Sequence, residues 1–198
     1  MRLLFFLCLF FGISHGENLF SKIDLSLTRA LEGDNHSALL DISMESIALS
    51  TPFIEFGYTG ILQLQLEKMH SITASTLGVQ LPIALGKYVI QKDRPRRQYK
   101  PRLWNSRWTS SFPSGHGATT AAWATTMALS FPQMKSMMIG YTLVSGYSQV
   151  YVGNHYISDV IAGWILGWVT ATLLHRSFET DQTNSMNTPF FRVTIPLQ

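Results

Sequence analysis

The chain has little cysteine and little charge. Its only cysteine, Cys8, lies near the start, so the sequence after it has no disulfide, no thiolate nucleophile and no cysteine-based metal site. Charged residues make up 14% of the 198 residues, whereas hydrophobic residues make up 46%. This composition lies between that of a soluble protein and that of a small membrane protein, and the length suits one domain with a sizeable core.

The apolar run at the start of the chain, from Leu3 to Ile13, is shorter than the roughly 20 residues that a membrane-spanning helix needs. It follows Arg2 and precedes the small residues Ser14 and Gly16, a pattern typical of a signal peptide. We therefore expect a signal peptide over residues 1–16, with a short N-terminal membrane anchor as the alternative. A helical domain over residues 17–176 and a polar C-terminal tail over residues 177–198 would follow.

Acidic residues are absent from Arg94 to Ser158, whereas eight of the fifteen Lys and Arg residues fall between Lys87 and Arg107. This distribution creates a local field that attracts anions. A solvated basic loop is the ordinary explanation of such a cluster. A binding role therefore depends on the motifs that lie inside and beside it.

The hydrophobic pattern predicts helices and contains no convincing strand, so we expect an all-α bundle of about six helices. Two amphipathic helices are predicted before residue 50, separated by Gly33-Asp34-Asn35. A third apolar stretch, over residues 51–66, contains enough polar residues to make a poor lipid-facing helix. Further helices are predicted over residues 72–90, after His116, over 134–152 and over 158–175. The last of these would have Ser158 as its N-cap and a close-packing face formed by Gly163 and Gly167.

Three loop-placed clusters could together bind and cleave a phosphate ester. Lys87 and Arg94 are seven positions apart, two helical turns, so both cations could reach one side of a helix end. Ser114 and Gly115 precede a predicted helix, whose N-terminal N–H groups would add neutral donors. The sequence thus predicts a phosphate cradle that uses no metal.

Two histidines supply the remaining roles of phosphoryl transfer. His155 and His116 could act as the nucleophile and the acid that protonates the leaving group. Asp159, at the start of the next helix, could hold one ring nitrogen of His155 as N–H. A metal site made of these three residues is the weaker interpretation, because the surrounding cations would repel a divalent ion.

The segments that carry these residues, "KYVIQKDRP", "PSGH" and "SQVYVGNHYISD", resemble the three ordered motifs of the type 2 phosphatidic acid phosphatase (PAP2) family. That family also includes bacterial acid phosphatases and vanadium-dependent haloperoxidases. The resemblance implies that Lys87, Arg94, Ser114 and Gly115 bind phosphate, that His116 is the general acid, and that His155 is a nucleophile forming a phosphohistidine and oriented by Asp159. It also implies that no metal or organic cofactor is needed.

One position departs from the family pattern: Gln149 stands where the third motif has an arginine that binds phosphate. Glutamine keeps two N–H donors, so we expect Gln149 still to bind phosphate. Because it lacks the positive charge, we expect a loss of one to two powers of ten in transition-state binding unless another cation compensates. The candidates for compensation are Arg96, Arg97, Arg102 and Arg107.

The predicted function is hydrolysis of a phosphate monoester, either a lipid phosphate or a small ester, at a site that faces the periplasm or the outside. The protein would be integral to a membrane or associated with its surface, or else soluble in the periplasm. We expect no nucleic acid and no obligate protein partner. The alternatives are a non-catalytic anion-binding or envelope-structural protein weakened by Gln149 and, as a further alternative, a vanadium haloperoxidase.

Overall fold

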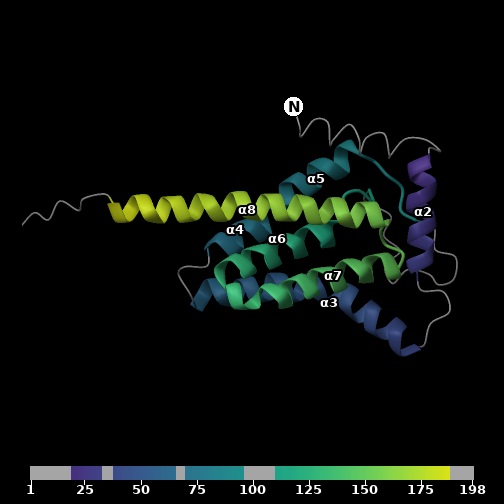
Figure 1. Ribbon diagram of the computed structural model, residues 1–198, viewed down its shortest axis with the longest axis horizontal. Coiled ribbons are helices and arrows are strands. Elements are labelled where there is room, and N and C mark those ends of the chain that lie inside the picture. Colours follow the sequence, from purple (N-terminus) through teal and green to yellow (C-terminus); the bar gives the residue numbers. More distant parts are fainter. Residues whose placement is uncertain (1–18, 33–37, 66–69, 96–109, 188–198) are drawn as a thin grey trace, which may run out of the picture.

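The computed structural model describes residues 19–32, 38–65, 70–95 and 110–187. Within these ranges the chain forms helices and loops and no strand, which confirms the predicted all-α bundle (Figure 1). The helices are α2 (Leu19–Leu31), α3 (Ala38–Gln65), α4 (His70–Gly78), α5 (Gln80–Val89), α6 (Gly115–Ser130), the short 3-10 helix η2 (Pro132–Met134), α7 (Lys135–Tyr151) and α8 (Ile157–Asn187). The predicted signal peptide lies outside the described residues.

Helix α3 is one continuous helix, which corrects the predicted separation between the second amphipathic helix and the stretch that begins at Thr51. Pro52 lies inside α3, where it removes one backbone hydrogen bond without ending the helix. The prediction that this stretch makes a poor lipid-facing helix agrees with the structure, because α3 is long enough but not apolar enough to cross a membrane. Glu55 is 1% exposed and accepts a hydrogen bond from Thr120 in α6, whereas Phe53 and Ile54 are exposed.

The predicted helix over residues 72–90 is divided into α4 and α5 at Val79. Pro82 has no N–H to donate to the carbonyl of Gly78, four residues earlier, so the hydrogen-bond ladder is interrupted there. The side chain of Gln80 donates to the carbonyl of Thr76 and to the hydroxyl of Thr119 in α6, at 3.0 Å each. These bonds fix the junction against α6, and α5 then leads towards the basic segment.

Helices α6 and α8 pack closely because their facing residues are small. A Cβ on Gly163 would lie 2.6 Å from the carbonyl oxygen of Ser114, and one on Gly167 would lie 2.2 Å from that of Ala118. Neither distance leaves room for a side chain, so the predicted close-packing face of these two glycines is confirmed. On the α6 side, Ala118 and Ala122 are completely buried.

Helix α8 begins one residue before the predicted N-cap, so Ser158 lies in its first turn rather than before it. The helix also continues beyond the predicted end at residue 175, to Asn187, because no proline or glycine occurs between Ser177 and Asn187. Its segment Ile157–Phe178 is long and apolar enough to cross a membrane, a test that α8 alone passes among the described helices.

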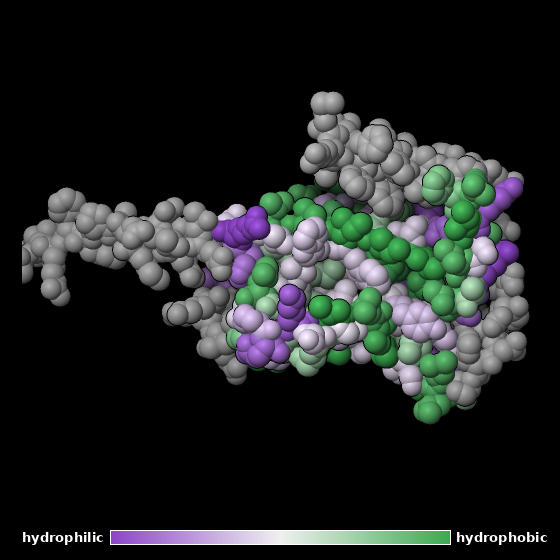
Figure 2. Space-filling view, in the orientation of Figure 1, coloured by the Kyte–Doolittle hydropathy of each residue, from purple (hydrophilic) through white to green (hydrophobic). Residues whose placement is uncertain are grey.

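Large apolar side chains are exposed along the outside of the bundle. On the face seen in Figure 2 they gather over several helices, interrupted by paler, more polar residues. Examples are Leu81 in α5, Ile139 in α7 and Trp168 in α8, which are 68%, 53% and 57% exposed. An apolar surface of this extent is unusual for a soluble monomer. It is typical of a surface that contacts a membrane or another protein.

Candidate active site

The two predicted phosphate-binding cations approach the same place from different backbone elements. Helix α5 ends at Val89, so Arg94 lies beyond the helix, and the prediction that two helical turns bring it beside Lys87 is wrong. Lys87 Nζ donates to the carbonyl of Ser110 at 2.6 Å, and Arg94 Nη1 donates to the carbonyl of Asn154 at 2.8 Å. Burial, and after it the charge of Arg94, lowers the pKa of Lys87, so the two cations nevertheless act on each other.

His155 is almost completely buried, at 2% exposed, in the loop between α7 and α8. Its Nδ1 lies 2.8 Å from the carbonyl oxygen of Ser111. Because a carbonyl oxygen can only accept, Nδ1 carries the proton and Nε2 is left with its lone pair. Arg94 Nη1 lies 3.3 Å from Nε2, so the lone pair faces a guanidinium group that could also bind a phosphate oxygen.

Asp159 lies near this ring but is not its hydrogen-bond partner. Its Oδ2 is 3.8 Å from Nδ1 of His155, beyond hydrogen-bond length. Oδ2 instead accepts from the hydroxyl of Ser111 and from the backbone N–H of Tyr156. Ser111 thus connects the aspartate with the histidine, and the predicted direct contact is replaced by a contact through a neighbouring residue.

Ser114 caps α6, and Gly115 and His116 form the first turn of that helix. The hydroxyl of Ser114 accepts from the backbone N–H of Gly117, and its own N–H donates to the carbonyl of Asp159 at 2.9 Å. The Ser114 amide is therefore already used within the fold. A Cβ on Gly115 would lie 3.9 Å from Cε of Lys87, so the lysine side chain passes directly over the N-terminus of α6.

Burial and positive neighbours keep both histidines neutral. Burial lowers the pKa of His155 to about 4. The pKa of His116 is lowered to about 4, first by burial and then by the nearby charges of His155, Arg94 and Lys87. Burial also lowers the pKa of Lys87 to about 8. These mutual effects place Lys87, Arg94, His116 and His155 in one electrostatic environment, in which Asp159 is the opposing charge.

The side chain of Gln149 is completely buried and bonds within the fold. Its Oε1 accepts from the side-chain amide of Asn154 at 3.2 Å, and its Nε2 lies 3.4 Å from the carbonyl oxygen of Ala48 in α3. Ala48 is four residues before Pro52, so proline leaves this carbonyl without its helical partner. Gln149 fills that vacancy and supports the loop that carries His155, a role that the sequence pattern does not indicate.

Lys92, Ser111 and Asn154 also contact the predicted site residues, and sequence reasoning missed all three. Lys92 Nζ lies 2.8 Å from Oδ1 of Asp159. Lys92 and Asn154 lie inside the quoted motif segments, so their positions were a usable signal. Ser111 lies outside those segments, and its contact with His155 is made by its backbone carbonyl. The arginines proposed to compensate for Gln149 lie outside the described residues.

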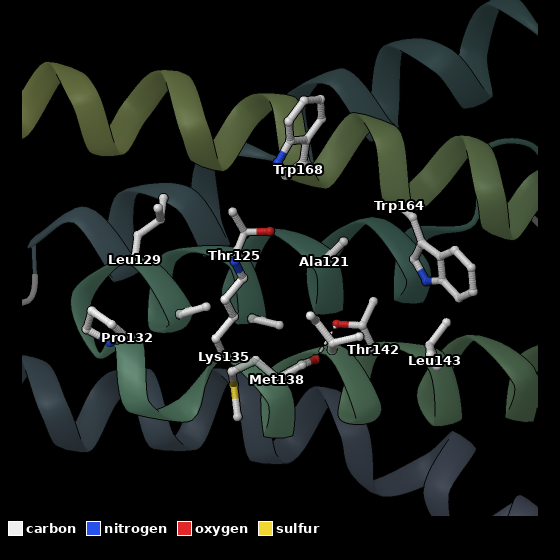
Figure 3. Close-up of a pocket in the computed structure, with 13 residues that line it drawn as sticks. Ala121, Thr125, Leu129, Pro132, Lys135, Met138, Thr142, Leu143, Trp164 and Trp168 are labelled. Atoms are coloured by element: carbon white, nitrogen blue, oxygen red, sulfur yellow. Dashed lines mark hydrogen bonds between the residues drawn. The ribbon is translucent and has the colours of Figure 1, made fainter.

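A separate apolar groove of about 620 Å³ lies between α6, α7 and α8. Trp164 and Trp168 of α8 lie on one side of it, Met138 and Leu143 of α7 on the other, and Ala121 of α6 between them (Figure 3). None of the predicted site residues lines this groove. The described residues also contain no group of three or more His, Cys, Asp or Glu side chains that could hold a metal ion.

Comparison with known proteins connects this arrangement to one family. The family model of the PAP2 superfamily matches residues 69–182. An undecaprenyl-diphosphatase of Sulfolobus acidocaldarius is 41% identical over 98 residues, which cover 46% of this chain and 47% of the relative. A lipid A 1-phosphatase of Rhizobium etli is 46% identical over 57 residues, covering 29% of this chain and 25% of the relative. The chain therefore matches about half or less of the length of these curated relatives.

Two solved structures share the fold at low sequence identity. The phosphatidylglycerolphosphate phosphatase of Bacillus subtilis, a transmembrane PAP2-type protein, has a TM-score of 0.69 and 21% identity, and the match covers 96% of each chain. LpxE from Aquifex aeolicus has a TM-score of 0.67 and 22% identity, covering 78% of this chain and 95% of the other. At these identities the likeness establishes the helical fold.

Proposed function

Because the chain belongs to the PAP2 superfamily, we propose that it hydrolyses a phosphate monoester of a lipid through a phosphohistidine on His155. The single observation that carries this proposal is the state of the His155 ring. Nδ1 donates to a backbone carbonyl, and the lone pair of Nε2 faces the guanidinium of Arg94. A buried neutral histidine beside cations is suited to attack a phosphorus atom whose oxygens those cations hold.

In the first step, the lone pair of His155 Nε2 forms a bond to phosphorus while the bond from phosphorus to the ester oxygen breaks. Lys87 and Arg94 neutralise the phosphoryl oxygens, and the N-terminus of α6 beside Gly115 adds its dipole. In the second step, water attacks phosphorus, the N–P bond breaks, and inorganic phosphate leaves. The electron pair of that bond returns to Nε2, so the histidine is restored to its starting state.

His116 is proposed to move the proton in both steps. In the absence of substrate its pKa is about 4, so it is neutral near pH 7. A bound phosphate anion offsets the cations that depress this pKa, so a monoanionic phosphate ester can bring the proton that His116 then gives to the leaving oxygen. In the second step neutral His116 accepts a proton from the attacking water and gives it to the departing phosphate, so His116 is neutral again at the end of the cycle.

A lipid substrate is favoured over a small ester. The relatives are named for undecaprenyl diphosphate and lipid A, and α8 can cross a membrane. The exposed apolar side chains of α5, α7 and α8 suit contact with acyl chains. We therefore place the protein in a membrane of the cell envelope, with the His155 end at one lipid surface and facing the periplasm or outside.

Turnover of defined substrates tests this proposal. Purified protein in detergent and chelator is incubated with phosphatidic acid, phosphatidylglycerol phosphate, undecaprenyl phosphates, lipid A and a soluble aryl phosphate, and inorganic phosphate is measured. We expect release from at least one lipid, and inhibition by vanadate. His155→Ala is the matched inactive control.

The alternative of a non-catalytic anion-binding protein gives a different result. That alternative is correct if the natural chain releases no phosphate from any substrate while Gln149→Arg does. Activity in the natural chain that is abolished by the chelator would contradict the metal-independent chemistry. Activity that survives in His155→Ala would contradict the assignment of the nucleophile.

A further inference from the structure

Lys92 joins helix α2 to Asp159. Its Nζ lies 2.8 Å from Oδ1 of Asp159 and 3.1 Å from Oδ2 of Asp24 in α2. The same ammonium donates to the hydroxyl of Ser158 at 3.0 Å and lies 4.2 Å from the ring centroid of Tyr156. Because Asp159 is completely buried, its carboxylate needs a paired cation, and Lys92 supplies one.

Helix α2 also provides the cap of α8. The carboxylate of Asp24 accepts from the backbone N–H of Ser158 at 3.1 Å, and the hydroxyl of Thr28 accepts from that of Ile157 at 3.2 Å. Both N–H groups belong to the first turn of α8, which has no partner for them within its own helix. The position of α2 therefore affects the same turn that carries Asp159.

The remaining surface of α2 has two exposed stripes. The apolar stripe contains Phe20, Ile23, Leu27 and Leu31, which are 42% to 58% exposed. The second stripe contains Lys22, Ser26 and Arg29, at a spacing of four and three residues, and all three are exposed. The acidic residue of the helix, Asp24, points inward to Lys92. The exposed charges of α2 are therefore positive.

An apolar stripe beside a basic stripe is typical of a helix that lies in the surface of an anionic bilayer. In Figure 1, α2 runs across the end of the bundle where α8 begins, transverse to the length of α8. If α8 crosses the membrane, α2 runs along the membrane surface. Both the charge and the direction of α2 favour a lipid surface over a second copy of this chain.

We propose that α2 binds an anionic lipid surface and that Asp24 and Lys92 transmit this position to Asp159. Lys92 is then a positioning residue, since it acts on His155 through Asp159. The inference rests on the proposed function, because Asp159 matters only if it supports a reactive His155. It extends that function by making the arrangement of the site depend on contact with lipid.

Contact with lipid is tested without any measurement of activity. In a Cys8→Ser background, Leu27→Cys and Ser26→Cys are labelled with a small fluorophore, and the full chain is reconstituted in phosphatidylglycerol vesicles. Nitroxides on the upper acyl chain should quench the label at position 27 several-fold more than the label at position 26. Equal quenching at both positions would overturn the proposal. So would a position-27 label shielded from lipid nitroxides and from aqueous iodide, which indicates a protein contact.

The connection through Lys92 is tested with Lys92→Met and the matched control Lys135→Met, at the exposed start of α7. We expect faster amide hydrogen exchange over residues 156–160 in Lys92→Met and no change in the control, a result that is independent of turnover. In the active protein, kcat should fall roughly 10- to 100-fold with KM within about twofold, and Lys92→Arg should recover most of it. Equal exchange in Lys92→Met and Lys135→Met would overturn the connection.

Discussion

The loop that carries His155 is supported differently on its two sides. On one side, Asp159 is held by the ammonium of Lys92, which also binds Asp24 of α2. On the other, Gln149 bonds Asn154 and the carbonyl of Ala48 in α3 without any formal charge. The first support is ionic and includes the partly exposed Lys92, whereas the second is neutral and centres on the completely buried side chain of Gln149.

This difference explains how Gln149 is accommodated at a position where the family pattern has arginine. A guanidinium at position 149 would need an anion or several acceptors in a buried place. Glutamine instead satisfies the carbonyl that Pro52 leaves without a partner. The charged support can therefore be expected to govern the chemistry of His155, and the neutral support to govern the shape and stability of its loop.

Removal of the loop's central residue should have the largest effect. His155→Ala leaves both supports but removes the proposed nucleophile, so turnover should fall by about 10⁴-fold or more. Phosphate release from the preferred lipid measures this effect, and an unchanged melting temperature in detergent shows that the fold is intact. Residual activity within tenfold of wild type would contradict the proposed role.

Neutralising the ionic support should have the next largest effect. Asp159→Asn keeps the size of the side chain and leaves Nδ1 of His155 bonded to the Ser111 carbonyl, so the correct tautomer persists. The fall in kcat should therefore be about 100-fold, smaller than the roughly 10⁴-fold loss that follows when a catalytic histidine takes the wrong tautomer. Steady-state kinetics at fixed pH measures the difference. A loss equal to that of His155→Ala would show that Asp159 participates more directly.

Disrupting the neutral support should have a smaller effect. Gln149→Met keeps the length of the side chain but removes two neutral hydrogen bonds of about 1 kcal/mol each, so kcat should fall by roughly tenfold. Thermal unfolding should show a parallel loss of stability. Because no charge is removed, added salt should not alter either effect.

Pro52→Ala is the matched test of the cause of that loss. Alanine at position 52 restores the N–H that can bond the carbonyl of Ala48. In the Gln149→Met background it should recover part of the lost stability, and in the wild-type background it should add less. Equal gains in the two backgrounds would show that Gln149 does not act through this carbonyl.

The pH dependence of stability should reflect the two buried histidines. His155 and His116 have pKa values of about 4 in the folded protein, below the value of about 6.5 in an unfolded chain. The unfolded state therefore binds more protons between these values, and stability should fall as pH decreases from about 6.5 to about 4. His155→Gln should flatten the profile of melting temperature against pH over this range. A profile unchanged in this variant would contradict the depressed pKa.

Much of the fold could be predicted because the helices carry strong local signals. The small residues of α6 and the pair Gly163 and Gly167 in α8 predicted a close contact that the structure contains. The divisions between helices were less predictable, because a proline removes one hydrogen bond but packing decides whether the helix continues. Pro52 is tolerated inside α3, where Gln149 binds the carbonyl left without a partner, whereas Pro82 accompanies the break between α4 and α5.

The ionisable groups of the site were predictable from three ordered motifs, but their partners were not. Lys87, Arg94, His116, His155 and Asp159 meet in one environment, as their mutual effects on pKa show. The contacts of Ser111 and Asp24 depend on how segments that are distant in the sequence meet in the fold. The Ser111 contact with His155 is made by a backbone carbonyl, which every residue type has. A sequence motif contains no information of that kind.

Direct detection of phosphate on His155 tests the central claim most directly. Protein mixed with its lipid substrate is quenched in base, where phosphohistidine survives, and digested for mass spectrometry. The account predicts a phosphoryl group on the peptide that contains His155 during turnover, and its absence from His155→Ala. Rapid turnover with phosphate on another residue, or with none on His155 at any quench time, would contradict it.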